Sequence, residues 1–222
     1  LFKPGFNVRG GLLLVPMGLV NELHEPTTFL GAKRPETERR IIPSTWREHG
    51  LGAPGSMGGF TYRSYVMNGL DADGFSASGL RGGRQKGSKA KFEDLAWVGR
   101  ADWIGTPGLI AGASVYTGDS GQDLTAADGS TFDVPTTIWE AHVDWRFRGL
   151  ELRGLYARSD LDGVAAALAR RGYQLDTARL AAVTILPATA CSGAVMRSSN
   201  VFAPLMRMSS PMSVPAGDTR RP

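Results

Sequence analysis

The residues of this chain that could take part in chemistry are mostly arginines and carboxylates at alternate positions. Between Thr136 and Ala157, charged side chains stand at every second position, so Glu140, His142, Asp144 and Arg146 share one face of an extended strand. A guanidinium offers several donors and a fixed charge, which suits transient coordination of phosphate or carboxylate groups. Carboxylates on the same face would pair with the arginines and weaken their field. The pattern therefore indicates contact with small charged or polar solutes.

Because successive side chains of a strand point to opposite faces, most of these side chains are expected on one polar face. Its members would be Arg9, Arg63, Arg100, Asp102, Glu140, His142, Asp144, Arg146, Arg148, Glu151 and Arg153. Strong phosphate selectivity does not follow from such a mixed wall, and a mild anion preference is the safer expectation. An ordinary solvated surface would carry the same mixture of charges.

Catalytic and metal-binding motifs find no support in the sequence. His24, His49 and His142 are scattered, and none has the spacing of a metal site. No G-x-S-x-G nucleophile motif is present. The aspartate pairs before Gly74 and Gly163 fit turn chemistry better than a calcium loop. We therefore expect a protein that is not an enzyme and that uses no cofactor or metal.

The elements that must position these residues are β-strands. Alternation of apolar and polar residues with period two predicts strands at 7–16, 58–68, 94–104, 109–117, 136–148 and 150–158. A seventh strand between residues 37 and 52 is needed if short and long connections are to alternate, although Pro43 interrupts it. The 29 glycines and 13 prolines of the 222-residue chain also suit a β-rich fold.

The layout predicts an all-β, antiparallel up-and-down meander. The expected strands are longer than the roughly 5–6 residues that are usual in soluble proteins. Tight turns at one end and long polar loops at the other are typical of a transmembrane β-barrel. No apolar run reaches the roughly 18 residues of a membrane-spanning helix. A periplasmic or secreted β-sandwich that binds ligands is the alternative, because its strands alternate in the same way.

Aromatic residues near both ends of the apolar face support the membrane interpretation. In a barrel these side chains would lie at the two membrane interfaces, and the residues of the polar face would line a water-filled pore. The residues concerned are Trp97, Trp103, Trp139, Trp145 and Phe147.

Four stretches of the chain resemble the phosphate-selective porin O and P family of bacterial outer-membrane proteins. They are GLLLVPMGLVNELHEPTTFLG (11–31), ERRIIPSTWREHG (38–50), SYVMNGLDADGFSASGLRGGRQKGSKA (64–90) and GLIAGASVYTGDSGQ (108–122). The resemblance covers roughly residues 6–162. It implies a sixteen-stranded, usually trimeric barrel in contact with outer-membrane lipid and lipopolysaccharide, through which small anions and other polar solutes diffuse.

Against that family pattern the chain is expected to be a fragment. About seven of the sixteen strands are present, and the first and last strands are missing. The first residues, LFKPGFNVRG, carry no signal peptide and are typical of the middle of a protein.

Basic residues also gather in two of the long connections. They are Lys33, Arg34, Arg39 and Arg40 in the first, and Arg81, Arg84, Lys86 and Lys89 in the second. They could attract anions to a pore mouth or bridge lipopolysaccharide phosphates. Flexible, solvated, outward-facing loops are the alternative.

The sequence divides into residues 1–162, the partial barrel, and residues 163–222, an atypical tail. The net charge of +4 for the whole chain equals that of residues 177–222, because residues 1–176 are balanced, so the sequence pI of about 9.5 does not indicate nucleic-acid binding. Either the tail is a disordered extension, or it derives from a wrong reading frame or a bad join. We expect it to be irregular, or partly helical around residues 163–183.

Overall fold

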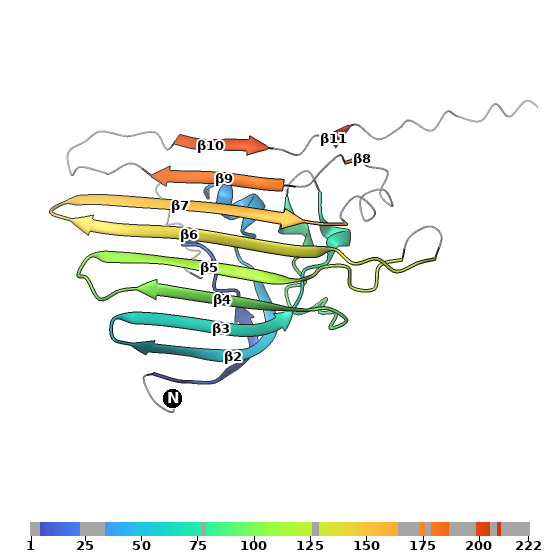
Figure 1. Ribbon diagram of the computed structural model, residues 1–222, viewed down its shortest axis with the longest axis horizontal. Coiled ribbons are helices and arrows are strands. Elements are labelled where there is room, and N and C mark those ends of the chain that lie inside the picture. Colours follow the sequence, from blue (N-terminus) through green and yellow to red (C-terminus); the bar gives the residue numbers. More distant parts are fainter. Residues whose placement is uncertain are drawn as a thin grey trace, which may run out of the picture.

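The computed structural model describes residues 5–22, 34–76, 79–125 and 129–163, and the backbone of four short strands between residues 174 and 209. The fold is all-β with little helix. Its main element is an antiparallel meander of seven strands (Figure 1). The strands are β1 (Arg9–Leu14), β2 (Arg47–Met57), β3 (Phe60–Asn68), β4 (Leu95–Trp103), β5 (Leu109–Asp119), β6 (Pro135–Phe147) and β7 (Leu150–Leu161).

The structure differs from the prediction at the strand expected between residues 37 and 52. Thr37–Ile41 forms a short π-helical turn, η2, and β2 begins only at Arg47. Pro43 has no N–H to donate to a neighbouring strand, which explains why the strand starts after it. The other six expected strands are confirmed within a few residues of their predicted ends.

Strands in the tail continue the sheet, where an irregular segment was expected. Residues 164–173, in the stretch expected to be partly helical, lie outside the described residues. β9 (Arg179–Leu186) pairs antiparallel with β7, and β10 (Ser199–Pro204) pairs with β9. Two shorter strands, β8 (Gln174–Leu175) and β11 (Met208–Ser209), pair with each other. Among the described strands, β1 and β10 are the two edges of an open nine-stranded sheet.

Cross-strand register assigns each residue to one of two faces. Tyr65, Val98, Tyr116 and Ile138 are successive partners across β3 to β6, and this side is called the inner face. Val66 and Trp97 are partners one residue along, on the opposite, outer face. The predicted alternation is therefore confirmed, with the charged residues of β4 and β6 on the inner face.

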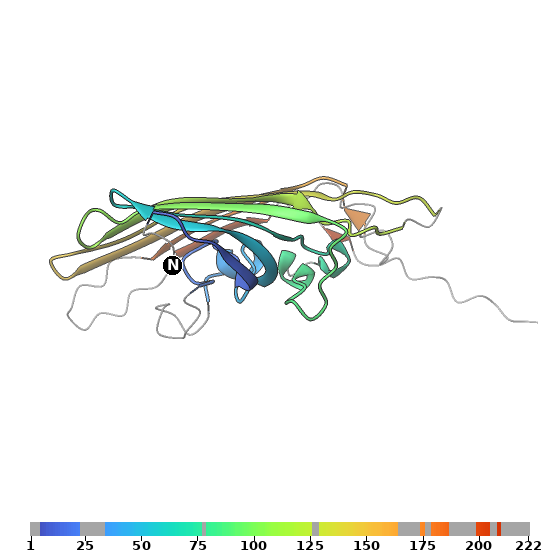
Figure 2. The ribbon, with the colours of Figure 1, turned by 90° about the horizontal axis from the view of Figure 1, so that it is seen from below.

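Three segments cover the inner face. They are residues 15–22, residues 34–46, and the β3–β4 connection with its short 3-10 turns η3 (Ala72–Gly74) and η4 (Leu80–Gly83). Figure 2 shows these segments on one side of the sheet only. Trp46 lies at the centre of the covered region, with its ring centroid 4.9 Å from that of Tyr116. Among the described residues, none of the helical elements is long and apolar enough to cross a membrane.

No described segment covers the outer face, although that face is the more apolar of the two. Leu51 is 60% exposed, Val66 47% and Trp97 42%. The inner face buries Glu48, Asp102, Glu140 and His142 together with its apolar residues. A water-soluble sheet buries its apolar face, so the polarity of this sheet is inverted.

The two ends of the sheet differ in their connections. Gly58 and Gly59 join β2 to β3 with positive φ angles of 57° and 86°, a conformation that favours glycine. The β4–β5 and β6–β7 turns lie at the same end, shown on the left of Figure 1. The connections after β1, β3 and β5 are long and lie at the other end. The predicted alternation of short and long connections is confirmed.

We predict that Trp46→Ala lowers the free energy of unfolding by about 3–5 kcal/mol, because it leaves a cavity in the covered region. The matched variant Trp139→Ala, on the outer face, should cost much less because this side chain is 38% exposed and no described covering segment packs on it. Urea unfolding, followed by circular dichroism, measures both. Equal losses would contradict the assignment of the two faces.

Candidate functional site

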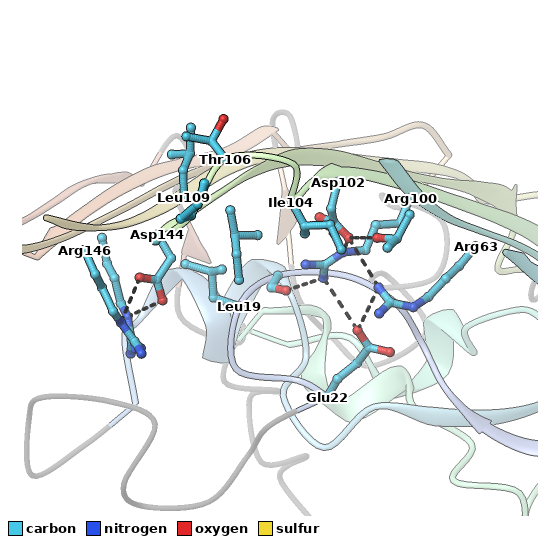
Figure 3. A pocket seen from close by; sticks show the side chains of 16 residues that line it. Leu19, Glu22, Arg63, Arg100, Asp102, Ile104, Thr106, Leu109, Asp144 and Arg146 are labelled. Atoms are coloured by element: carbon cyan, nitrogen blue, oxygen red, sulfur yellow. Dashed lines mark hydrogen bonds and ion pairs between the residues drawn. The ribbon is translucent and has the colours of Figure 1, made fainter. Parts of the chain in front are cut away.

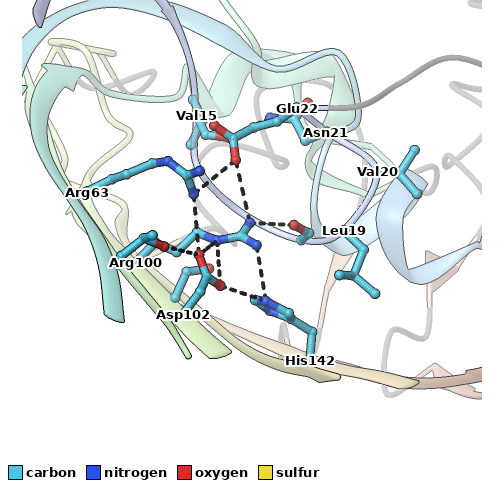
Figure 4. A network of polar contacts seen from close by, with 12 residues as sticks. Val15, Leu19, Val20, Asn21, Glu22, Arg63, Arg100, Asp102 and His142 are labelled. Atoms are coloured by element: carbon cyan, nitrogen blue, oxygen red, sulfur yellow. Dashed lines mark hydrogen bonds and ion pairs between the residues drawn. The ribbon is translucent and has the colours of Figure 1, made fainter. Parts of the chain in front are cut away.

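The candidate site is built around the segment from Val15 to Glu22, which we call the strap and which follows β1 across the inner face (Figure 4). Asn21 fixes its shape. The Asn21 Nδ2 donates to the carbonyl oxygens of Val15 at 2.7 Å and Trp46 at 3.1 Å, and its Oδ1 accepts from the Trp46 amide at 2.6 Å. The strap is therefore tied to the segment that precedes β2.

Glu38 binds the middle of the strap. Its Oε1 accepts from the amides of Leu19 and Val20, each at 2.6 Å. Gly18 has a φ of +74°, and a Cβ there would lie 2.4 Å from that carboxylate oxygen, so glycine is required for this approach. Burial raises the pKa of Glu38 from 4.5 to about 7, against the two backbone hydrogen bonds and with the nearby Glu140 adding to the increase.

Beneath the strap, His142 lies between two carboxylates of the inner face. Its Nδ1 is 2.9 Å from Glu140 Oε2, and its Nε2 is 2.9 Å from Asp102 Oδ1. Glu140 also accepts from the Ser114 hydroxyl at 2.6 Å. An imidazolium ring would donate to both carboxylates, which satisfies all three buried groups.

Arg100 connects this cluster to the strap. Its Nη1 donates to the Gly18 carbonyl oxygen at 2.6 Å, and its Nε donates to Asp102 at 2.8 Å. Arg63 and Glu22 complete a closed set of four alternating charges, which we call the strap quartet: Glu22, Arg63, Arg100 and Asp102. Its four N–O contacts are 3.2, 3.4, 2.8 and 3.8 Å.

A second closed set lies near the β6–β7 turn. This turn quartet consists of Asp144, Arg146, Glu151 and Arg153. Asp144 contacts Arg153 at 2.8 Å and Arg146 at 3.5 Å, and Glu151 contacts the same two arginines at 2.9 and 3.3 Å. Both quartets therefore have as many carboxylates as guanidiniums.

An open cavity of about 830 Å³ connects the two quartets. Figure 3 shows Arg63 and Glu22 at one end and Asp144 and Arg146 at the other, with Leu19 between them. Ile104, Leu109 and Ile110 also line the cavity. The site is thus a groove with charged ends and an apolar middle, bounded by the strap and strands β3 to β7.

The predicted polar-face residues are largely brought together, but not all of them meet water. Glu140 and His142 have side chains that are 0% exposed. The expectation of a water-filled space beside these two residues is wrong, because the strap and Glu38 cover them. Arg63, Arg146 and Glu151 do reach the groove or its rim.

Two predicted arginines lie apart from the groove. Arg9, at the start of β1, lines a smaller hollow with Glu22 and Arg63. Arg148 is in the β6–β7 turn with a φ of 48°, and its guanidinium lies 5.0 Å from the ring centroid of Phe147. Alternation along the strand wrongly assigned Arg148 to the polar face, because β6 ends at Phe147.

The five aromatic residues predicted at membrane interfaces share the outer face by register. Trp97 and Trp139 lie nearer the end with long connections. Trp103, Trp145 and Phe147 lie nearer the tight turns, where Trp145 and Phe147 stack with centroids 5.6 Å apart.

Of the basic residues in the connections, three converge on one hydroxyl-bearing segment. Arg34 and Arg81 each donate to Ser44 Oγ, at 3.1 and 3.3 Å, and Arg84 donates to the Ser44 carbonyl oxygen at 2.6 Å. Burial and the neighbouring Arg81 lower the pKa of Arg84 to about 10. These arginines hold the covering segments together, in addition to any attraction of anions.

The remaining basic residues are more exposed. Arg39 and Arg40 both pair with Glu36, at 3.0 and 2.7 Å. Lys86 and Lys89 are exposed in the β3–β4 connection. Lys33 lies outside the described residues.

Glu22, Glu38 and Asn21 are the site residues that sequence reasoning missed. They lie in segments without periodicity, where parity assigns no face. Their partners lie far along the chain, as for Glu22 and Arg100. No local signal in the sequence could have found them. In the described part of the chain, no group of three or more His, Cys, Asp or Glu residues is arranged to hold a metal ion.

Comparison with known proteins gives one relative. The chain is 38% identical over 177 residues to an uncharacterized protein of Aquifex aeolicus (strain VF5), a match that covers 75% of this chain and 38% of that protein. The chain therefore spans well under half of the relative that it matches. No family model matches the chain, and no solved structure matches it.

We predict that the strap is held most tightly at acidic pH. Because the pKa of Glu38 is raised from 4.5 to about 7, the covered state binds a proton that the open state releases, so docking weakens from about pH 4.5 to 7 and is constant above that. Hydrogen exchange of the Leu19 and Val20 amides, corrected for intrinsic rates, measures the effect.

Glu38→Gln is the informative variant for this prediction. It keeps an oxygen that accepts from both amides but cannot ionise, so the pH dependence between about pH 4.5 and 7 should disappear. Glu36→Gln, which removes a half-buried carboxylate paired with Arg39 and Arg40, should leave the profile unchanged. An unaltered profile in Glu38→Gln would contradict the assignment.

Proposed function

We propose that this chain forms part of the wall of an outer-membrane β-barrel porin, through which small hydrophilic solutes diffuse passively. The observation that carries the proposal is the inverted polarity of the sheet. Its uncovered face is apolar, and its covered face bears paired charges beneath a strap that would fold into the lumen.

Lipid is the environment that suits the outer face. Large apolar side chains such as Leu51, Val66 and Trp139 are each more than a third exposed there, and no described segment packs on them. Contiguous apolar surfaces of this kind mark sites of contact with another protein or with membrane. In a barrel wall they would contact acyl chains.

The strands and their connections agree with this proposal. β3 has 9 residues, β6 has 13 and β7 has 12, which is enough for a tilted strand to cross a bilayer. The two groups of outer-face aromatics would lie at the two interfaces. The tight turns would face the periplasm and the long connections the exterior.

The β-sandwich alternative fits less well. It would bury the apolar face against a second sheet and leave the charged face in water. Here the charged face is the covered one, and Arg100 and Asp102 are 8% and 5% exposed. Recovery of the full-length protein from the soluble fraction without detergent would favour the sandwich and contradict the porin.

The proposal includes the partners of an outer-membrane porin. Outer-membrane lipid and lipopolysaccharide would surround the outer face, and the full-length protein would assemble as a homotrimer. No catalytic step is assigned. An anion preference would have to arise from the basic connections, since the charges of the two quartets cancel.

We predict that Ala113→Arg, on the outer face of β5, costs about 2–4 kcal/mol of folding free energy in a bilayer, because an arginine near the midplane must leave water. In a water-soluble protein a substitution at an exposed position changes stability by about 0.5 kcal/mol or less. Folding of the full-length protein into lipid vesicles, followed by heat-modifiable migration on gels, distinguishes the two.

Ser88→Arg, in the exposed β3–β4 connection, is the control and should fold like the wild type. If Ala113→Arg also folds like the wild type, the outer face does not contact lipid and the porin proposal fails.

A further inference from the structure

We infer that the groove between the two quartets selects zwitterionic solutes of the amino-acid and short-peptide class over anions and cations of the same size. This inference rests on the proposed function, because it names the solutes that such a pore would favour.

The first step is the charge balance of the groove. Each arginine of the strap quartet contacts both of its carboxylates, and the same is true of the turn quartet. Each end of the groove is therefore neutral as a whole but strongly polar locally. A neutral end gives little long-range attraction to either sign of ion.

The second step is which charges a solute could reach. Arg100 and Asp102 are almost fully buried, whereas the side chains of Glu22 and Arg63 are 26% and 27% exposed. A carboxylate that approaches Arg63 also meets Glu22, which repels it. A solute with an ammonium group beside its carboxylate can contact both partners at once. The attraction of its ammonium group to Glu22 then offsets the repulsion between Glu22 and its carboxylate.

The third step is the apolar middle. Leu19, Ile104 and Ile110 line the groove between its charged ends. The apolar side chain of an amino acid or short peptide can contact these residues while its charged groups contact Glu22 and Arg63.

The probes are three forms of leucine: the free amino acid, its N-acetyl derivative and its amide. At pH 7 they are zwitterion, anion and cation on the same framework. Uptake into liposomes that contain the full-length protein is measured by mass spectrometry, with protein-free liposomes as the blank. We expect the zwitterion to enter about fivefold faster than either ion, the size of effect that one exposed ion pair in water gives.

Variants in the two quartets test the assignment from opposite sides. Glu22→Gln leaves the strap quartet with an excess arginine and should speed the anion relative to the zwitterion. Arg146→Gln, whose side chain is 60% exposed and thus tolerant of change, leaves an excess carboxylate and should speed the cation instead. Glu93→Gln, an exposed carboxylate in the β3–β4 connection, should leave all three rates unchanged.

The outcomes separate this inference from the porin proposal. If the protein passes potassium chloride and small sugars but the anion enters fastest, or all three probes enter equally, the selectivity is wrong and the porin proposal stands. If neither quartet variant changes the order of rates, the groove is not the selective region. If the reconstituted protein passes no solute at all, both proposals fail.

Discussion

Charged groups can be buried in a protein only where opposite charges and hydrogen bonds compensate them, and this requirement organises the inner side of the sheet. Arg100 satisfies it for three partners at once, since it contacts the Gly18 carbonyl oxygen, Asp102 and Glu22. Removal of this one guanidinium would leave Asp102 dependent on Arg63 and His142. The position of the strap, and hence the shape of the groove, depends on these pairs together with the apolar packing of Val15 and Met17.

The inverted polarity has a second effect on the fold. Because the apolar side chains on the outer face do not contribute to a protein core, the core must lie between the inner face and the covering segments. Trp46, Ile41 and Met17, all fully buried, come from residues outside the strands. The long connections are therefore structural parts of the domain.

Much of the sheet could be predicted from the sequence, because alternation is a local property. In β4 from Gly99 to Trp103, and in β6 from Trp139 to Phe147, apolar and polar residues alternate, so both the strands and their faces were foreseen. β2 was misplaced because its own sequence, REHGLGAPGSM, is rich in glycine and contains proline. Its position depends on pairing with β3, which no local pattern reveals.

The site was foreseen only in part, for a related reason. Parity placed Arg63, Asp102 and Asp144 on one face, but it could not show that Glu22 and Glu38 would approach them from segments distant in sequence. Nor could it show that the strap buries His142. The contacts that close the groove join residues up to 122 positions apart, as for Gly18 and Glu140, and such contacts follow from the packing of the whole fold.

The positions of the tryptophans also allow intrinsic fluorescence to distinguish the two sides of the sheet. Of the five tryptophans, Trp46 is fully buried beneath the sheet, whereas the other four belong to the outer face. Intrinsic fluorescence therefore reports mainly on whatever covers that face. Brominated lipids would quench the four outer indoles and spare Trp46, whose emission would then follow the state of the covering segments alone.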